Sequence, residues 1–195
     1  MRTSGEGKAI AQEFQTHLIV LGGLVALMWG IEIGDQLIFR PILHTTVDIY
    51  GIIPRNPIGL RGILFAPFLH GSFAHLIGNT VPFIILGWLI LLRQTSDFFW
   101  VSLISGLVSG GGTWLFGSSG VHIGASGVIF GYLGYLLLRG YFERSAISIA
   151  VSLGVGTLYG SLIWGVLPMQ YGISWEGHLF GFLGGILAAR LLTKK

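Results

Sequence analysis

A serine among small residues, in the segment Gly124-Ala125-Ser126-Gly127, is the first place where this chain could do chemistry. The preceding residues 117–123 are rich in glycine and serine and favour a loop, whereas residues 128–138 are apolar enough for a lipid-embedded helix. Ser126 is therefore expected in the first turn of a membrane helix. Backbone N–H groups there lack partners within the helix, so they would stabilise an oxygen anion. Taken alone, the segment also fits an N-cap or a small-residue packing face.

Three other polar side chains fall in strongly apolar segments. His75 and Asn79 are four residues apart, so they share one helix face, and His178 lies at the start of the last apolar segment. Polar groups inside a membrane cost free energy and are tolerated where they face a bundle interior or a water-filled cavity. A neutral histidine beside a serine can act as its general base, which would be the role of His178 toward Ser126. His75 and Asn79 would donate hydrogen bonds to the oxyanion.

Glycines indicate how closely these segments approach one another. They repeat every four residues in two segments, Gly127 and Gly131 in one and Gly177, Gly181 and Gly185 in the other. Small residues at this spacing let two helix backbones come together, which would bring His178 within reach of Ser126. Phe130, one turn after the serine, is expected to pack against the imidazole and hold its orientation.

Composition places the chain in a membrane. Of its 195 residues 52% are hydrophobic and only 10% charged, and the mean hydropathy is +0.78, whereas about 25% charged residues is usual for a soluble domain. The 11 Lys and Arg are scattered rather than clustered, which argues against nucleic acid as a partner. The chain has no cysteine, so a disulfide or a thiolate metal site is excluded. We expect an all-α polytopic membrane protein.

Six apolar segments are expected to cross the membrane: residues 14–31, 73–92, 98–116, 124–138, 145–163 and 176–192. Residues 1–13 are interpreted as a polar tail, and residues 40–61 and 164–175 as loops. Most positive charges fall on the side of the two termini, which predicts cytoplasmic termini. The residues on that side are Arg2, Lys8, Arg93, Arg139, Arg144, Arg190, Lys194 and Lys195, against Arg40, Arg55 and Arg61 on the other. The second, fourth and sixth helices would then run inward from the outer face.

These motifs resemble, in order and spacing, the bacterial rhomboid family of intramembrane serine proteases. The resemblance covers residues 60–190 and is carried by the segments 70–79 (HGSFAHLIGN), 124–131 (GASGVIFG) and 177–185 (GHLFGFLGG). It implies a single rhomboid-like domain over residues 1–195, a bundle of six transmembrane helices in a bacterial cell membrane.

The same resemblance implies functional residues. Ser126 matches the nucleophile and His178 the base, with His75 and Asn79 as the oxyanion-binding pair. The supporting positions are Phe130, Gly124, Gly127 and Gly181. The implied activity is cleavage of transmembrane-anchored protein substrates near the outer membrane surface, without metal or cofactor.

Two positions depart from the family pattern. The family often has Trp-Arg in the first loop, where this chain has Arg61 and Gly62, and this difference concerns how the loop is braced. Relatives often have tyrosine one turn after the nucleophile, where this chain has Phe130. Stacking on His178 would survive that change, but a phenolic hydrogen bond would not.

Several alternatives to a serine protease agree less well with the sequence. An inert client-binding relative would typically lack the serine or the histidine, and a transporter would show inverted repeats, which are not evident. The histidines do not have the His-Glu-x-x-His spacing that would indicate a metal site. Gly34-Asp35 is not part of the Gly-x-Gly-Asp pattern of an aspartyl intramembrane protease. His70 is expected to bond loop backbone, and no function is expected for His44 or His122. Glu176, two residues before His178, would point to another helix face.

Overall fold

The computed structural model describes residues 3–168 and 172–193, and this part of the chain is helical throughout. Its six long helices are α1 (Thr3–Gly34), α3 (Phe73–Leu91), α4 (Thr95–Phe116), α5 (Ser126–Glu143), α6 (Ala146–Tyr159) and α7 (Trp175–Leu192). The described residues form no β-strand, only one isolated bridge between Ile52 and His122. The predicted helical membrane bundle is confirmed, and α3 to α7 begin within a few residues of the expected segments.

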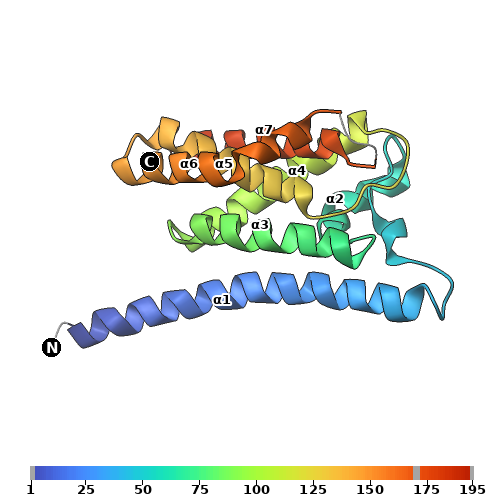
Figure 1. The fold of residues 1–195 in the computed structure, drawn as a ribbon, viewed down its shortest axis with the longest axis horizontal. Coiled ribbons are helices and arrows are strands. Elements are labelled where there is room, and N and C mark those ends of the chain that lie inside the picture. Colours follow the sequence, from blue (N-terminus) through green and yellow to red (C-terminus); the bar gives the residue numbers. More distant parts are fainter. Residues whose placement is uncertain (1–2, 169–171, 194–195) are drawn as a thin grey trace.

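The other long helices lie on two sides of α3 (Figure 1). Helix α1 is long and gently curved and lies along one side of the molecule, next to α3. Helices α4, α5, α6 and α7 lie together beyond α3, and α7 packs mainly against α5 and α4. Of the helices expected to carry the functional residues, α5 therefore packs against both α3 and α7.

Four helical segments are long and apolar enough to cross a membrane: Gly7–Phe39, Phe73–Leu91, Thr95–Phe116 and Ala146–Val166. Helices α5 and α7 are less apolar than these four segments because they contain several glycines and charged residues. Helix α5 is mostly buried by its neighbours and contacts α7 more than any other helix. The two helices that carry Ser126 and His178 are thus the two that depend most on contacts with other helices rather than with lipid.

The boundaries of two expected segments are corrected by the structure. Residues 3–13 are not a separate tail but the first turns of α1, because alanine, lysine, glutamate and glutamine in this segment favour helix. The expected loop 40–61 contains two 3₁₀ turns, η2 (Val47–Tyr50) and η3 (Pro57–Arg61). Two further short turns, α2 (Gly62–Phe65) and η4 (Ala66–Phe68), lead toward α3, and a 3₁₀ segment, η5 (Gly160–Val166), continues α6. Arg2, Lys194 and Lys195 lie outside the described residues.

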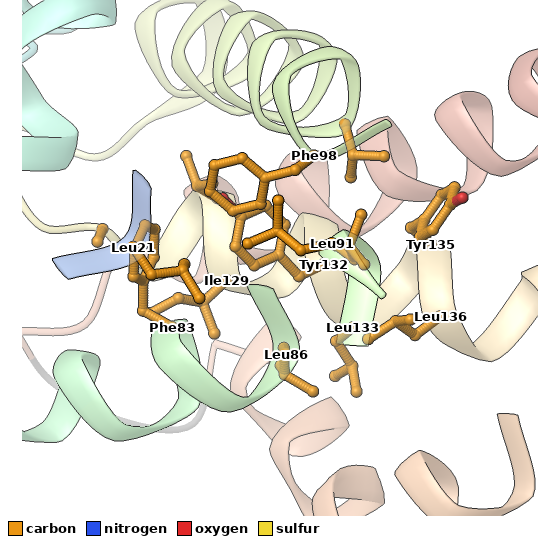
Figure 2. Close-up of a cluster of buried hydrophobic side chains, with 14 of the residues drawn as sticks. Leu21, Phe83, Leu86, Leu91, Phe98, Ile129, Tyr132, Leu133, Tyr135 and Leu136 are labelled. Carbon is orange, nitrogen blue, oxygen red and sulfur yellow. The ribbon is translucent and has the colours of Figure 1, made fainter. Parts of the chain in front are cut away.

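The apolar core gathers around one face of α5 (Figure 2). Leu21 of α1, Phe83 and Leu86 of α3 and Phe98 of α4 pack there with the α5 side chains. The members from α5 include Ile129, Tyr132, Leu133, Tyr135 and Leu136. Because α5 begins at Ser126, this packing also fixes where the serine lies.

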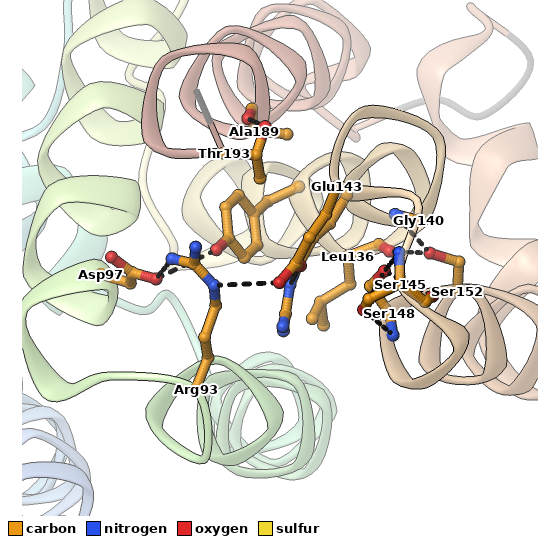
Figure 3. A network of polar contacts seen from close by, with 12 residues as sticks. Arg93, Asp97, Leu136, Gly140, Glu143, Ser145, Ser148, Ser152, Ala189 and Thr193 are labelled. Carbon is orange, nitrogen blue, oxygen red and sulfur yellow. Dashed lines mark hydrogen bonds and ion pairs between the residues drawn. The ribbon is translucent and has the colours of Figure 1, made fainter. Parts of the chain in front are cut away.

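A polar network closes the other end of α5 (Figure 3). Arg93, in the connection between α3 and α4, forms an ion pair with Asp97 and lies 3.8 Å from a carboxylate oxygen of Glu143. The hydroxyl of Tyr135 donates to Asp97 over 3.3 Å, and Arg139 also pairs with Glu143. The network ties α5 to its neighbours far from Ser126, so it stabilises the helix without entering the candidate site.

Helices α5 and α7 touch through their backbones. A Cβ added at Gly181 would overlap the carbonyl of Gly127, and one added at Gly185 would overlap the carbonyl of Gly131. Helix α4 joins this contact through Ser109, whose hydroxyl donates to the carbonyl oxygen of Gly177 over 2.8 Å. Substituting Gly181 or Gly185 would force the two helices apart.

This contact predicts the effect of a single methyl group. Gly185→Ala is expected to destabilise the protein by about 1–3 kcal/mol, the usual cost of overpacking, and thus to lower the thermal unfolding midpoint in detergent. Gly111→Ala on α4 is the control, because a Cβ there would meet no atom within 4 Å. Equal unfolding midpoints for the two variants would contradict this account.

Candidate active site

Ser126 is the first residue of α5, and the loop before it is held by backbone hydrogen bonds. The N–H of Gly124 donates to the carbonyl oxygen of Ala66 over 2.8 Å, and the bridge to Ile52 holds His122. Gly124 has φ of +114°, a conformation that side chains with a Cβ rarely adopt, and a Cβ there would lie 2.7 Å from Nε2 of His75. Glycine is therefore required at this position both by the turn and by its neighbour.

The structure brings Ser126 and His178 together. Nε2 of His178 lies 2.8 Å from Oγ of Ser126, and Nδ1 lies 2.9 Å from the carbonyl oxygen of Gly165. A carbonyl oxygen can only accept a hydrogen bond, so Nδ1 carries the hydrogen in the neutral ring. Nε2 is then the lone-pair nitrogen and accepts the hydroxyl hydrogen of Ser126, the arrangement that a general base requires.

Phe130 holds the plane of the imidazole. Its ring stacks on His178 with centroids 4.1 Å apart and an angle of 7° between the planes. Gly165 lies against both rings, since a Cβ there would be 2.7 Å from Cζ of Phe130 and 3.3 Å from Nδ1 of His178. Sequence reasoning did not predict this contact of Gly165, because it uses the backbone oxygen.

His75 and Asn79 of α3 face the same cavity as Ser126 and His178. The cavity has a volume of about 1140 Å³. Helix α3 starts beside it because the hydroxyl of Ser72 caps the helix, accepting the N–H of His75 over 3.2 Å. Asn79 is buried and uses one amide hydrogen to bond the carbonyl oxygen of His75, 3.1 Å away. Its side chain is thereby oriented, with a second N–H available for another acceptor.

His70 packs against this pair without joining it. The side chain is fully buried, and its ring lies edge-on to His75 with centroids 5.1 Å apart. Burial, and after it the charge of His75, lower the pKa of His70 to about 4, so the ring is neutral at pH 7. The sequence predicted that His70 bonds loop backbone, whereas the structure shows it packing against His75. The expected hydrogen bonds of its ring nitrogens to loop backbone are not found among the described residues.

Glu176 and His122, for which no function was expected, join the loop that leads to Ser126 to the start of α7. Oε1 of Glu176 accepts the N–H of Ser118 over 2.9 Å, so Glu176 does not pair with His178 and does point to another face. His122 bonds on both sides of its ring: Nδ1 lies 2.7 Å from Oγ of Ser174, and Nε2 lies 2.8 Å from the carbonyl oxygen of Ser118. The sequence gave no sign of these contacts, because they form only when α7 meets the loop.

The first loop is braced without the Trp-Arg pair. A guanidinium nitrogen of Arg61 donates to the carbonyl oxygen of Ile49 over 3.0 Å, and the group lies 4.5 Å from the ring centroid of Tyr50. Gly62 is pressed against the backbone of Gly51, where a Cβ would overlap. An arginine therefore fits at position 61 and no side chain fits at position 62.

The arrangement suits nucleophilic chemistry. A serine hydroxyl bonded to an oriented neutral imidazole is an activated nucleophile, and the unpaired N–H groups at the start of α5 lie beside it. Within the described residues no group of three or more His, Asp or Glu side chains could hold a metal ion.

Comparisons with known proteins place the chain in a family. A model of the rhomboid domain matches residues 59–195. An uncharacterized protein of Mycobacterium tuberculosis is 40% identical over 188 residues, which cover 89% of this chain and 76% of that protein. A Mycobacterium leprae protein, also uncharacterized, is 39% identical, over 87% of this chain and 68% of its own. A Bacillus subtilis protein named "Putative rhomboid protease YdcA" is 33% identical, over 92% of this chain and 88% of its own.

Proposed function

The chain belongs to the rhomboid family, and on that basis we propose that it is an intramembrane serine protease with Ser126 and His178 as its catalytic dyad. The observation that carries the proposal is the 2.8 Å contact between Oγ of Ser126 and Nε2 of His178, with the other ring nitrogen bonded to Gly165. The two side chains come from different helices, and nothing in the packing of α5 against α7 requires a hydroxyl and an imidazole to meet there.

In the proposed mechanism, Oγ of Ser126 attacks a peptide carbonyl while Nε2 of His178 takes the hydroxyl proton. The tetrahedral intermediate collapses when the imidazolium returns that proton to the leaving amine, which leaves an acyl-enzyme. A water molecule from the cavity, deprotonated by the same nitrogen, then attacks the acyl carbon, and the ring returns this proton to Oγ of Ser126 as the ester bond breaks and the new carboxyl end leaves. The carbonyl of Gly165 accepts the Nδ1–H throughout and stabilises the imidazolium.

The oxyanion would be bound by donors from two helices. The backbone N–H of Ser126 lies in the first turn of α5, where the helix dipole also favours negative charge. His75 and Asn79 face the same cavity from α3 and would add side-chain donors. Gly124 permits this grouping, because any side chain there would collide with His75.

The proposed substrates are proteins anchored by a transmembrane helix. Such a helix hides its carbonyls in hydrogen bonds, so it must unwind locally before Ser126 can reach one. The site is crowded, since His75 and Ser109 fill the space beside Gly124 and Gly127, and this crowding favours small residues at the cleaved position. Positive charges on the side of the termini support cytoplasmic ends and a cavity that opens to the outer face of a bacterial cell membrane.

A fluorophosphonate probe tests the proposed dyad directly. Detergent-purified protein is expected to be labelled, and Ser126→Ala should abolish labelling because the reacting oxygen is gone. His178→Ala should reduce labelling to near background, since no other base contacts the hydroxyl in the described residues. Unfolding midpoints close to that of the wild type would show that both variants are folded. Full labelling of folded Ser126→Ala would refute the mechanism.

The orienting role of Gly165 gives a second test. Gly165→Ala is expected to slow probe labelling by about 10- to 100-fold, because the added methyl group displaces the rings of Phe130 and His178 and small misplacements are costly. Gly160→Ala in the same segment is the matched control, since a Cβ there would meet no atom within 4 Å. An equal labelling rate in the two variants would show that the Gly165 contact does not orient the base.

Asn79 is tested by cleavage of a model substrate with one transmembrane helix. Asn79→Ala should lower kcat by about 10- to 1000-fold, the range for losing one oxyanion donor. KM should change little, because the donor acts mainly in the transition state. A variant that raises KM and keeps kcat would instead place Asn79 in ground-state substrate binding.

A further inference from the structure

The loop that carries Ser126 is attached to the start of α7 at two points. Loop residues 117–125 run from the end of α4 to Ser126, and Ser118 near their beginning donates its N–H to Oε1 of Glu176. Farther along, Nδ1 of His122 contacts Oγ of Ser174. The mechanism proposed above uses neither contact.

Ser174 bonds His122 instead of capping its own helix. It is the N-cap residue of α7, where a serine side chain normally accepts an N–H from the first turn of the helix. Its side chain makes no such bond here and lies instead 2.7 Å from His122. The start of α7 is therefore bonded outward to the loop rather than capped by its own residue.

The ring of His122 has a defined tautomer. Nε2 faces the carbonyl oxygen of Ser118 at 2.8 Å and must donate to it. Nδ1 of the neutral ring then accepts the hydroxyl hydrogen of Ser174. His122 thus joins two parts of the loop to each other and joins the loop to α7.

The surroundings of Glu176 are energetically unfavourable for a carboxylate. Its side chain is only 3% exposed, one carboxylate oxygen holds the Ser118 N–H, and no partner for the other is found in the described part of the chain. Burial of a carboxylate with incomplete hydrogen bonding is unfavourable. A glutamate here must therefore contribute something that an apolar residue would not.

We propose that Glu176 is a positioning residue, which clamps the loop 117–125 onto α7 and thereby sets the separation of the Ser126 hydroxyl and the His178 imidazole. His122 is the second point of the same clamp. The inference rests on the proposed function and adds a residue that touches neither substrate nor reacting atoms. Glu176 lies two residues before His178 on α7, and Ser118 lies in the loop that ends at Ser126, so one hydrogen bond spans the gap between the two supports.

The dyad needs such a support because its two members are held by separate elements. On one side of the site, the glycine contact between α5 and α7 fixes the distance between the helices. On the other side, the segment Gly117-Ser118-Ser119-Gly120 has a flexible composition and would lose much conformational entropy on ordering. Without the clamp, the loop would keep its backbone bonds to Ile52 and Ala66 but would not be attached to α7. A misplacement of about 1 Å is enough to slow a reaction by about 100-fold.

The test compares Glu176→Ala with Glu176→Gln by the rate of fluorophosphonate labelling across a range of pH. Glu176→Ala is expected to slow labelling by about 10- to 100-fold. Glu176→Gln should label within about 3-fold of the wild type, because its amide oxygen can accept the same N–H without the charge. The pH at half-maximal rate should be unchanged in both, since a positioning residue alters geometry rather than the proton affinity of His178.

His122→Ala gives an independent route to the same answer if Glu176→Ala does not fold. It should also slow labelling, and in folded protein the double variant should lose less than the product of the two single effects. Ser119→Ala is the control in the same loop, because its exposed side chain makes no hydrogen bond to the residues that the structure describes.

Three results would overturn the inference: a wild-type rate in folded Glu176→Ala, equal slowing in the Ala and Gln variants, or a displaced pH profile in Glu176→Gln. The last two would show that the charge of Glu176 matters rather than its hydrogen bond. Failure of the proposed function is distinct from these, because the wild-type protein itself would then not be labelled.

Discussion

The backbone contact between α5 and α7 is the constraint on which the site depends. Lipid tails are as apolar as leucine side chains, so two membrane helices gain little from burying apolar surface against each other and associate through close packing instead. The glycines at 181 and 185 allow carbonyl groups of α5 to lie where side chains of α7 would be, and those at 127 and 131 leave room for the hydroxyls of Ser109 and Ser105 on α4. That proximity places an imidazole on α7 next to the first residue of α5. A looser pair of helices could carry the same side chains and still fail to join them.

The polar groups of the site are stabilised by partners inside the protein. His178 bonds the carbonyl of Gly165, Asn79 bonds that of His75, and Glu176 bonds the N–H of Ser118. Each contact uses a backbone group, which remains in place whatever substrate is present. In an apolar environment such bonds reduce the cost of burial and also orient the side chains before any substrate arrives. The same contacts thus stabilise the bundle and orient the side chains of the site.

Sequence reasoning was most successful where residue type and helical period carry the information. The glycine spacing predicted that α5 and α7 meet, and the position of Phe130 one turn after Ser126 predicted its stacking on His178. It missed Gly165, because a backbone carbonyl acceptor leaves no mark in residue type. The partners of His122 and Glu176 were also missed, since loop contacts depend on how α7 meets the loop. The start of α1 was placed too late, because polar residues that form helix well resemble a tail in a hydropathy pattern.

The carbonyl of Gly165 would allow the proposed histidine base to work with no carboxylate bonded to it. A carboxylate at Nδ1 would fix the tautomer and stabilise the imidazolium, but burying its charge at this depth would cost far more than burying a neutral acceptor. A backbone carbonyl fixes the same tautomer, and its dipole still favours the protonated ring as the proton arrives. Phe130 supplies the remaining restraint on the ring by stacking, without any polar group. In the proposed mechanism, orientation and charge therefore have separate sources: the carbonyl and the phenyl ring orient the base, and charge develops on it only during the reaction.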